Sequence, residues 1–178
     1  GEPGLKVTEE RGRRGFSARN TLEGFRMGHK QTPEGIFRRL VLEGFITSNR
    51  AGYPDLPVKT ELIEIPHGAK VKVKVTGFDE RVVALNDRNI TRKIIPAQPP
   101  AVKNIPDSLR PFHYNREAYQ KDRFYGDTLI EVKEIGILRN RRLARLKIAP
   151  FHYNPVKNQL KVRNNVRFEL EFMDESQT

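Results

Sequence analysis

Cysteine is the most informative absence from this sequence, since none of the 178 residues is a cysteine. The chain therefore holds no disulfide, no thiol nucleophile and no cysteine-bound metal site of its own. Long apolar runs are absent as well, because no stretch approaches the roughly 20 residues that a membrane-spanning helix needs. The sequence shows no signal-peptide pattern. We therefore expect no membrane insertion.

Patterns of catalytic chemistry are also missing. The glycines are scattered over turns and form no phosphate-binding loop. No serine stands in a recognisable nucleophile–base pattern. The motif PFHYN occurs twice, at 111–115 and 150–154, and its two histidines could share a metal. The simpler interpretation is that each PFHYN ends a strand and its asparagine opens a turn. None of the histidines has metal-ligand spacing to another: His29, His67, His113 and His152. We predict no catalytic residue, no metal and no cofactor.

Acidic residues are outnumbered, with 22 Asp and Glu against 33 Lys and Arg, which gives a formal net charge of +11. Such a surface favours anionic partners, such as nucleic acid, anionic lipid or polysaccharide, or an acidic protein face. Nucleic-acid recognition requires cations that cluster on one surface among aromatic residues. In this sequence the cations are instead spread along the chain. The densest cluster, at 139–147, is typical of a hairpin tip followed by a solvated strand face. We therefore expect no nucleic-acid partner.

Alternation of apolar and polar residues predicts many short strands and almost no helix. In AKVKVKVT, Val71, Val73 and Val75 fall on one face and three lysines on the other. Similar runs are KTELIEI, ERVVAL, DTLIEVKEIGIL, RRLARLKIAPF, NQLKVRN and VRFELEF, with a bulge or turn expected at the Asn-Asn pair 164–165. The one helical candidate is 114–123. This pattern indicates an all-β, antiparallel sandwich or jelly roll in one domain at 21–174, with a loosely ordered basic arm at 1–20 and a short tail at 175–178.

The segment IIPAQPPAVKNIPD, residues 94–107, interrupts this series of strands. Four prolines restrict the backbone and favour a stiff, extended course around a single cation, Lys103. A stiff extended segment loses little conformational entropy when it docks in a cleft. The composition alone shows no more than an extended, basic connection, and an exposed loop with a solvated lysine is the alternative.

Three stretches carry a resemblance to a known family: GYPDLPVKTELIEIPHGAKVKVKV, RPFHYNREAYQKDRFYGD and APFHYNPVKNQLKVRNNVRFELEF. Together they resemble the N-terminal propeptides of gingipain-type, caspase-like C25 cysteine peptidases, with the greatest likeness to the lysine-specific members. The resemblance implies a β-sandwich that holds a downstream catalytic domain latent, helps it to fold and is later cut away. It implies export from a Bacteroidetes-type cell, and hence a secreted or periplasmic location, for a virulence protease whose catalytic residues lie outside this chain.

The resemblance also implies a use for the proline segment. In these propeptides a loop places a basic side chain in the specificity pocket of the peptidase, and alignment on Pro-x-Gln-Pro gives that place to Lys103. Its neighbours in the loop are Val102, Asn104, Pro99 and Pro100. If the register differs, three other cations become candidates: Arg92, Lys93 and Arg110.

A function of another class stays open. A secreted β-sandwich can bind polysaccharide or a cell-surface component through a groove of exposed aromatic side chains and inhibit no protease. The candidate aromatic residues are Tyr114, Tyr119, Tyr125 and Tyr153.

Overall fold

The computed structural model describes residues 3–86 and 92–174. Over these residues the chain is almost entirely strand, with one short α-helix and two 3₁₀ turns. The elements, in chain order, are β1 (Gly4–Glu10), η1 (Gly12–Arg14), β2 (Gly15–Thr21), β3 (Arg26–Thr32), β4 (Gly35–Val41), β5 (Lys59–Ile65), β6 (Ala69–Ala84), η2 (Asp107–Leu109), α1 (Arg116–Tyr119), β7 (Ile130–Leu138), β8 (Arg141–Ile148), β9 (Phe151–Asn154) and β10 (Gln159–Asp174).

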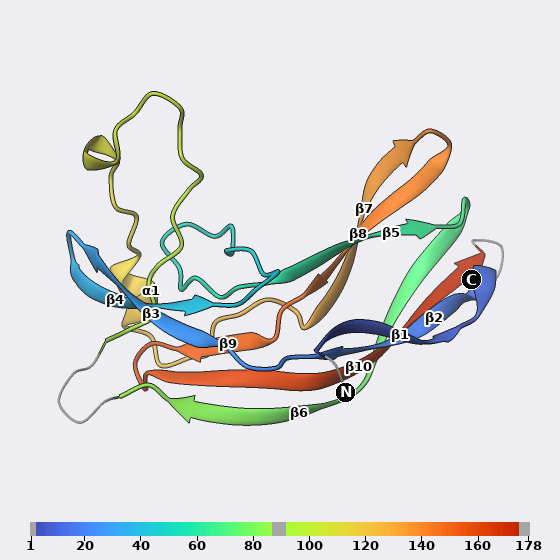
Figure 1. The fold of residues 1–178 in the computed structure, drawn as a ribbon, viewed down its shortest axis with the longest axis horizontal. Coiled ribbons are helices and arrows are strands. Elements are labelled where there is room, and N and C mark those ends of the chain that lie inside the picture. Colours follow the sequence, from blue (N-terminus) through green and yellow to red (C-terminus); the bar gives the residue numbers. More distant parts are fainter. Residues whose placement is uncertain (1–2, 87–91, 175–178) are drawn as a thin grey trace.

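Two antiparallel sheets form the body of the molecule (Figure 1). The larger sheet has the order β1-β2-β10-β6, and β9 also pairs with β10. The smaller sheet has the order β5-β8-β7, and β3 and β4 form a separate hairpin. Phe168 and Leu170 of the larger sheet share one buried cluster with Leu146 and Ile148 of the smaller sheet. The predicted all-β sandwich is therefore confirmed.

Strand β10 has strand neighbours on both sides along most of its length in the larger sheet. It pairs with β6 throughout, with β9 along its first residues and with β2 along its last residues. The sequence predicted two segments here, separated at the Asn-Asn pair. The structure shows one strand with a register shift after Asn164, and Asn165 has a φ of 49°. The Asn164 side chain explains the bulge, because its Oδ1 accepts from the Leu22 N–H at 2.7 Å.

The alternating lysine strand has the predicted two faces at Val71 and Val73, whereas Val75 is 38% exposed and lies outside the buried cluster. In β6, Val71 and Val73 pack against the buried cluster of the sandwich, whereas the intervening lysines are exposed. The strand continues without a break through ERVVAL, which the sequence suggested was separate. The cationic cluster at 139–147 forms the turn and most of the second strand of the β7–β8 hairpin, as predicted, and the turn uses Arg139 and Asn140 with positive φ.

The prediction of a loosely ordered arm at residues 1–20 is wrong. This segment forms β1 and β2, and β2 lies between β1 and β10 in the larger sheet. Its inward positions are Phe16, Ala18 and Asn20, of which Ala18 and Asn20 are 2% and 1% exposed. Alanine is only weakly apolar and asparagine is polar, so the inward-facing positions of β2 do not stand out in the sequence from the arginines around them. The predicted tail at 175–178 lies outside the described residues.

The short helix α1 falls within the predicted range 114–123. Asn115 caps it, because its Oδ1 accepts from the N–H of Ala118 at 3.0 Å. In the second PFHYN, Asn154 does the same for the turn after β9, where its Oδ1 accepts from two backbone N–H groups. Both asparagines therefore open turns, although only the second motif lies on a strand. No helix in the described ranges is long and apolar enough to cross a membrane.

Candidate inhibitory loop

The proline segment forms a long loop that rises from the body of the molecule. Figure 1 shows its two arms, drawn in yellow-green at the upper left, standing clear of both sheets. Every residue from 98 to 109 is exposed, whereas residues 94–97 at its base are buried. The loop is thus a projection with a fixed base.

The outgoing arm is fixed through backbone hydrogen bonds on both sides. Ile95 N–H donates to the carbonyl of Arg38 at 2.8 Å, and Ala97 N–H donates to the carbonyl of Tyr53 at 2.7 Å. The buried Tyr119 hydroxyl donates to the carbonyl of Ile94 at 2.6 Å. Since buried backbone groups are costly to leave unpaired, this network determines where the arm leaves the body.

Gly52 allows the neighbouring turn to approach this base. Its N–H donates to the carbonyl of Ala97 at 2.8 Å, and its carbonyl accepts from the N–H of Asn115 at 3.0 Å. Its φ is +84°, and a Cβ there would lie 3.2 Å from the Asn115 nitrogen. Glycine at this position therefore joins the outgoing and returning sides of the loop.

The returning arm is anchored by aromatic side chains. Phe112 and Tyr114 both pack on Phe37 of β4, with ring centroids 6.0 and 5.6 Å away. Tyr114 also packs edge-on against Tyr119 at 4.9 Å. Such edge-to-face pairs contribute beyond their buried area. The arm therefore joins the body at a well-packed point.

Gln98 closes the neck of the loop. Its side-chain nitrogen donates to the carbonyl of His113 at 2.8 Å, and its Oε1 accepts from the N–H of His113 at 2.9 Å. The Gln98 amide thus forms one donor and one acceptor hydrogen bond with the backbone of His113, as a paired residue of an adjacent β-strand would. No pattern in the sequence indicates that Gln98 pairs with the backbone of His113.

The tip of the loop is a turn rather than an extended strand. Ile105 N–H approaches the carbonyl of Val102 at 3.5 Å, so that Lys103 and Asn104 are the two central residues. Asn104 has a φ of 73°, a conformation that asparagine tolerates better than most residues. The expectation of an extended course therefore fails at Lys103 itself, because Asn104 reverses the chain.

Arg110 braces this turn from inside the loop. Its Nε and Nη2 donate to the carbonyl of Ile105 at 3.2 and 3.1 Å, and Nη2 also lies 3.4 Å from the carbonyl of Val102. Its Nη1 forms an ion pair with Asp107 at 2.9 Å. Arg110, the alternative candidate for the pocket residue, therefore has its guanidinium bound to other residues of the loop.

The candidate cations differ in accessibility. Lys103 is exposed and makes no hydrogen bond or ion pair with any other described residue. Arg92 and Lys93 are half-buried at the base, where their carbonyls accept from Asn158 Nδ2 and from Arg38 N–H. Pro99 and Pro100 line the outgoing arm, and Val102 is 58% exposed beside the lysine. Lys103 is the one Lys or Arg between residues 94 and 109.

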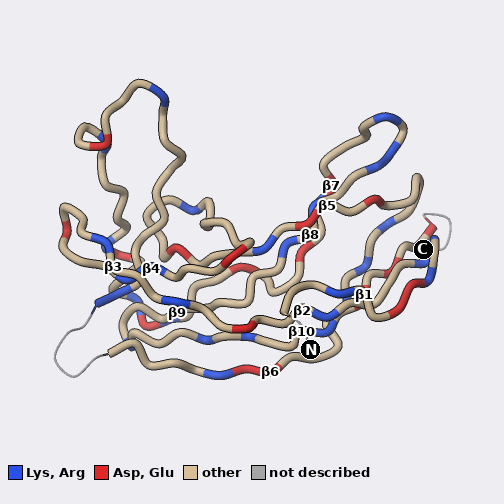
Figure 2. Tube along the Cα trace, in the orientation of Figure 1, with Lys and Arg blue, Asp and Glu red and all other residues tan. Residues whose placement is uncertain are grey.

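Elsewhere in the described chain, lysines and arginines are interspersed with acidic residues, as Figure 2 shows. In the β7–β8 hairpin, Arg142 pairs with Glu134 at 2.7 Å, and Lys147 pairs at 3.1 Å with Asp127, which precedes β7. The side-chain hydrogen bond from Arg142 lowers the pKa of Glu134. The cationic cluster of this hairpin is thus partly neutralised by its own neighbours.

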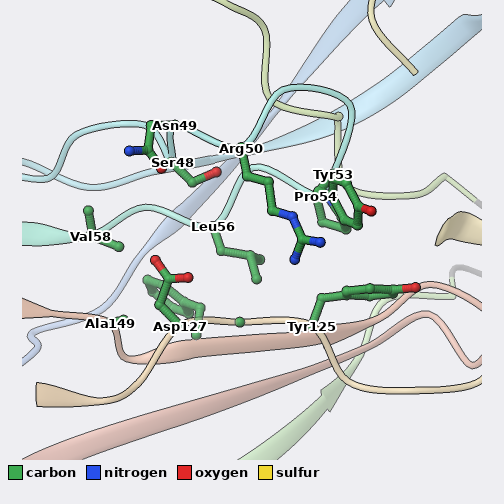
Figure 3. Close-up of a pocket in the computed structure, with 12 residues that line it drawn as sticks. Ser48, Asn49, Arg50, Tyr53, Pro54, Leu56, Val58, Tyr125, Asp127 and Ala149 are labelled. Carbon is green, nitrogen blue, oxygen red and sulfur yellow. The ribbon is translucent and has the colours of Figure 1, made fainter. Parts of the chain in front are cut away.

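The tyrosines proposed for a binding groove do not form one. Tyr119 and Tyr153 are 1% and 0% exposed, and burial raises the pKa of both hydroxyls. Tyr114 belongs to the aromatic anchor of the returning arm. Tyr125 is 7% exposed and lines a separate pocket, where Arg50 reaches over the ring of Tyr53 (Figure 3). These side chains give the polysaccharide alternative no support.

The histidines of the repeated motif have different environments. His113 is exposed at the neck of the loop, and His152 Nε2 lies 2.9 Å from the carbonyl of Asp127. Among residues 3–86 and 92–174, no three histidine or acidic side chains gather closely enough to hold a metal ion.

Comparisons with known proteins agree with this architecture. The Propeptide_C25 family model matches residues 21–178. Lys-gingipain HG66 from Porphyromonas gingivalis is 35% identical over 157 residues, which cover 88% of this chain and 9% of that protein. Gingipain R1 from the same organism is 21% identical over 145 residues, or 82% of this chain and 14% of that protein. The chain thus spans a small part of the length of these curated relatives.

Two solved structures share the fold. A structure concerned with the zymogenic latency of gingipain K from Porphyromonas gingivalis matches with a TM-score of 0.89 and 32% identity, over 97% of this chain and 95% of that chain. A complex of the RgpB pro- and mature domains from the same organism matches with a TM-score of 0.80 and 17% identity, over 96% and 84%. The chain therefore belongs to the C25 propeptide family, and it is a propeptide domain rather than an enzyme.

Proposed function

We propose that this propeptide keeps a cysteine peptidase domain of the same precursor latent by placing Lys103 in its specificity pocket. The partner is a caspase-like catalytic domain downstream in the chain, and the precursor passes through the periplasm to the cell surface or the medium. The propeptide also assists the folding of that domain. The observation that carries the proposal is the presentation of Lys103, an exposed cation without a partner among the described residues, at the tip of a loop with a fixed base.

The physical chemistry of such a pocket favours this role. A pocket for basic side chains requires a buried acid, and a lysine that enters it exchanges water for a charge-assisted contact. Truncation of one partner of a buried charge pair typically costs about 2–5 kcal/mol. Within one precursor the local concentration of the loop is roughly millimolar, so that modest intrinsic affinity suffices for latency. The greater identity to Lys-gingipain than to gingipain R1 supports a lysine-specific partner.

The test combines the isolated chain with the catalytic domain of Lys-gingipain and follows hydrolysis of a lysyl peptide substrate. Lys103→Ala should weaken inhibition by about a hundredfold, because it removes the pocket cation. Lys121→Ala is the matched control, since Lys121 is exposed outside the loop and pairs only locally with Glu117 at 3.3 Å.

Two results would count against the proposal. If the unaltered chain does not inhibit, the latency function is wrong for this chain. If Lys103→Ala inhibits as well as the unaltered chain does, the assignment of the pocket residue is wrong. Lys103→Arg serves as a further probe, because a pocket selective for lysine should accept it less well.

A further inference from the structure

The tip of the loop combines two features that concern one peptide bond, between Lys103 and Asn104. A peptidase that takes Lys103 into its pocket brings this bond to its catalytic groups. The following inference rests on the proposed function and addresses why the loop would act as an inhibitor rather than a substrate.

The backbone after Lys103 has the wrong conformation for cleavage. Peptidases hold a substrate extended on both sides of the bond that they cut. Asn104 instead has a φ of 73°, and the approach of Ile105 N–H to the carbonyl of Val102 closes the turn. Extension of the chain at this point requires opening the turn.

Arg110 contacts both sides of the same bond. Its guanidinium donates to the carbonyl of Ile105, after the bond, at 3.1 and 3.2 Å, and lies 3.4 Å from the carbonyl of Val102, before the bond. Asp107 pairs with the remaining nitrogen at 2.9 Å and so orients the guanidinium plane. The planar, multi-donor geometry of arginine suits this bridging role, and a lysine would not reproduce it.

We propose that Arg110 is the positioning residue that makes the loop resistant to its own target peptidase. It acts in two ways. Before cleavage it holds the Lys103–Asn104 bond in the turn. Hydrolysis would add the hydroxyl of water to the Lys103 carbonyl carbon and a proton to the Asn104 nitrogen. After that step Arg110 would still hold both new ends, and their proximity favours resynthesis of the bond with release of water.

A lysine-specific serine endopeptidase tests the brace without the cognate enzyme. This probe is chosen because replacement of Arg110 removes none of its cleavage sites. Mass spectrometry would follow the loss of the peptide that spans residues 103 and 104. We expect Arg110→Ala to accelerate cleavage at this bond about tenfold, since charge-assisted hydrogen bonds that restrain the turn are lost. Cleavage at other lysines should be unchanged.

Three matched variants make this test sharper. Arg141→Ala removes an exposed arginine that pairs with Glu64 at 3.9 Å, and it should not alter cleavage at Lys103. Asn104→Gly keeps access to positive φ and should stay close to the unaltered chain. Asn104→Val disfavours positive φ and should accelerate cleavage even if Arg110→Ala proves unstable. Equal cleavage rates in the unaltered chain, Arg110→Ala and Asn104→Val would overturn the proposal.

A second experiment separates this inference from the proposed function. With the catalytic domain of Lys-gingipain, the unaltered chain should inhibit durably and stay intact. Arg110→Ala should inhibit at first and then release activity as the Lys103–Asn104 bond is cut. Failure of the unaltered chain to inhibit would refute the function. Durable inhibition by an intact Arg110→Ala chain would support the function and refute the brace.

Discussion

Buried Asp55 contributes to the base of the loop that carries Lys103. Asp55 is 8% exposed, and its Oδ1 accepts from the N–H of Ser48 at 2.9 Å. Its own N–H donates to the carbonyl of Ile95 in the outgoing arm at 2.8 Å. Burial is the main influence on this carboxyl and raises its pKa, although the Ser48 hydrogen bond and Arg39 oppose the shift. The protonation state of the Asp55 carboxyl should therefore affect the stability of the structure around the loop base.

The stability of the fold should depend on pH through Asp55. In the unfolded chain Asp55 ionises near its ordinary pKa of about 3.9, whereas the folded chain holds the proton to higher pH. Stability should therefore fall as pH rises through that window, and the loss is complete above the folded pKa. Asp55→Asn keeps the acceptor but cannot ionise, so its unfolding free energy relative to the unaltered chain should increase from pH 4 to pH 7.

Urea unfolding at a series of pH values measures this difference. Glu61→Gln is the control, because Glu61 is an exposed acid on β5 and its replacement removes a negative charge without burial. An Asp55→Asn chain that is less stable than the unaltered chain by the same amount at every pH would show that folding does not raise the pKa of Asp55.

At the scale of elements, the loop and the sandwich are held by separate interactions. The neck bond between Gln98 and His113 and the aromatic anchor at Phe112 fix the loop from below, and the brace at Arg110 is confined to the tip. Residues 98–109 are all exposed and contribute little to the core. The loop should therefore be separable from the fold.

Excision of the loop tests this separation. Replacement of residues 99–111 by a short Gly-Ser linker keeps Gln98, Phe112 and His113. We expect the thermal midpoint to change by no more than a few degrees, since the cost of loop closure depends weakly on length. Inhibition of the Lys-gingipain catalytic domain should be lost at least as fully as in Lys103→Ala. Retained inhibition would place the inhibitory contact elsewhere on the sandwich.

The sequence predicted the strands that have a recognisable run of apolar residues. It did not predict features that depend on pairing with another strand or on side-chain hydrogen bonds between separate segments. KTELIEI is a short run rich in apolar residues between turn residues, and it forms β5 over the predicted residues. RMGHKQT carries almost no apolar residue, so β3 was not predicted, and it forms because β4 pairs with it. Prolines marked the loop and Lys103 within it. The Gln98 neck and the Arg110 brace join residues 15 and 5 to 8 positions apart through side chains, and neither leaves a periodic signal.

At the scale of the whole molecule, the formal net charge of +11 is distributed rather than concentrated. Lys70, Lys72 and Lys74 are exposed along β6, and many other cations lie beside acids (Figure 2). A field of this kind attracts an acidic partner over a distance without specifying contacts. The charge should therefore act on the rate of encounter, and Lys103 on the lifetime of the complex.

Salt dependence separates these two roles. Raising ionic strength from about 0.02 to 0.5 M should slow association with the Lys-gingipain catalytic domain about tenfold or more, because exposed charges are screened. Dissociation should change little. Lys103→Ala should instead act mainly on dissociation. Stopped-flow measurement of association across salt concentrations is decisive, and a rate that does not vary with salt would show that the net charge does not guide encounter.

The central position of β10 has a consequence for the order of folding. This strand comes last among the described elements, yet β2, β6 and β9 all pair with it. A chain that emerges N-terminus first cannot close its larger sheet until residues 159–174 have appeared. Pairing over such distances is slow, because the entropy of closing long loops is lost before the contacts form. Ile94 at the base of the loop shares a buried cluster with Leu160 and Val162 of β10, so the loop that carries Lys103 gains this part of its support only after β10 has emerged. Under the proposed function, the loop would then be positioned late in the synthesis of the propeptide, before synthesis of the peptidase domain is complete.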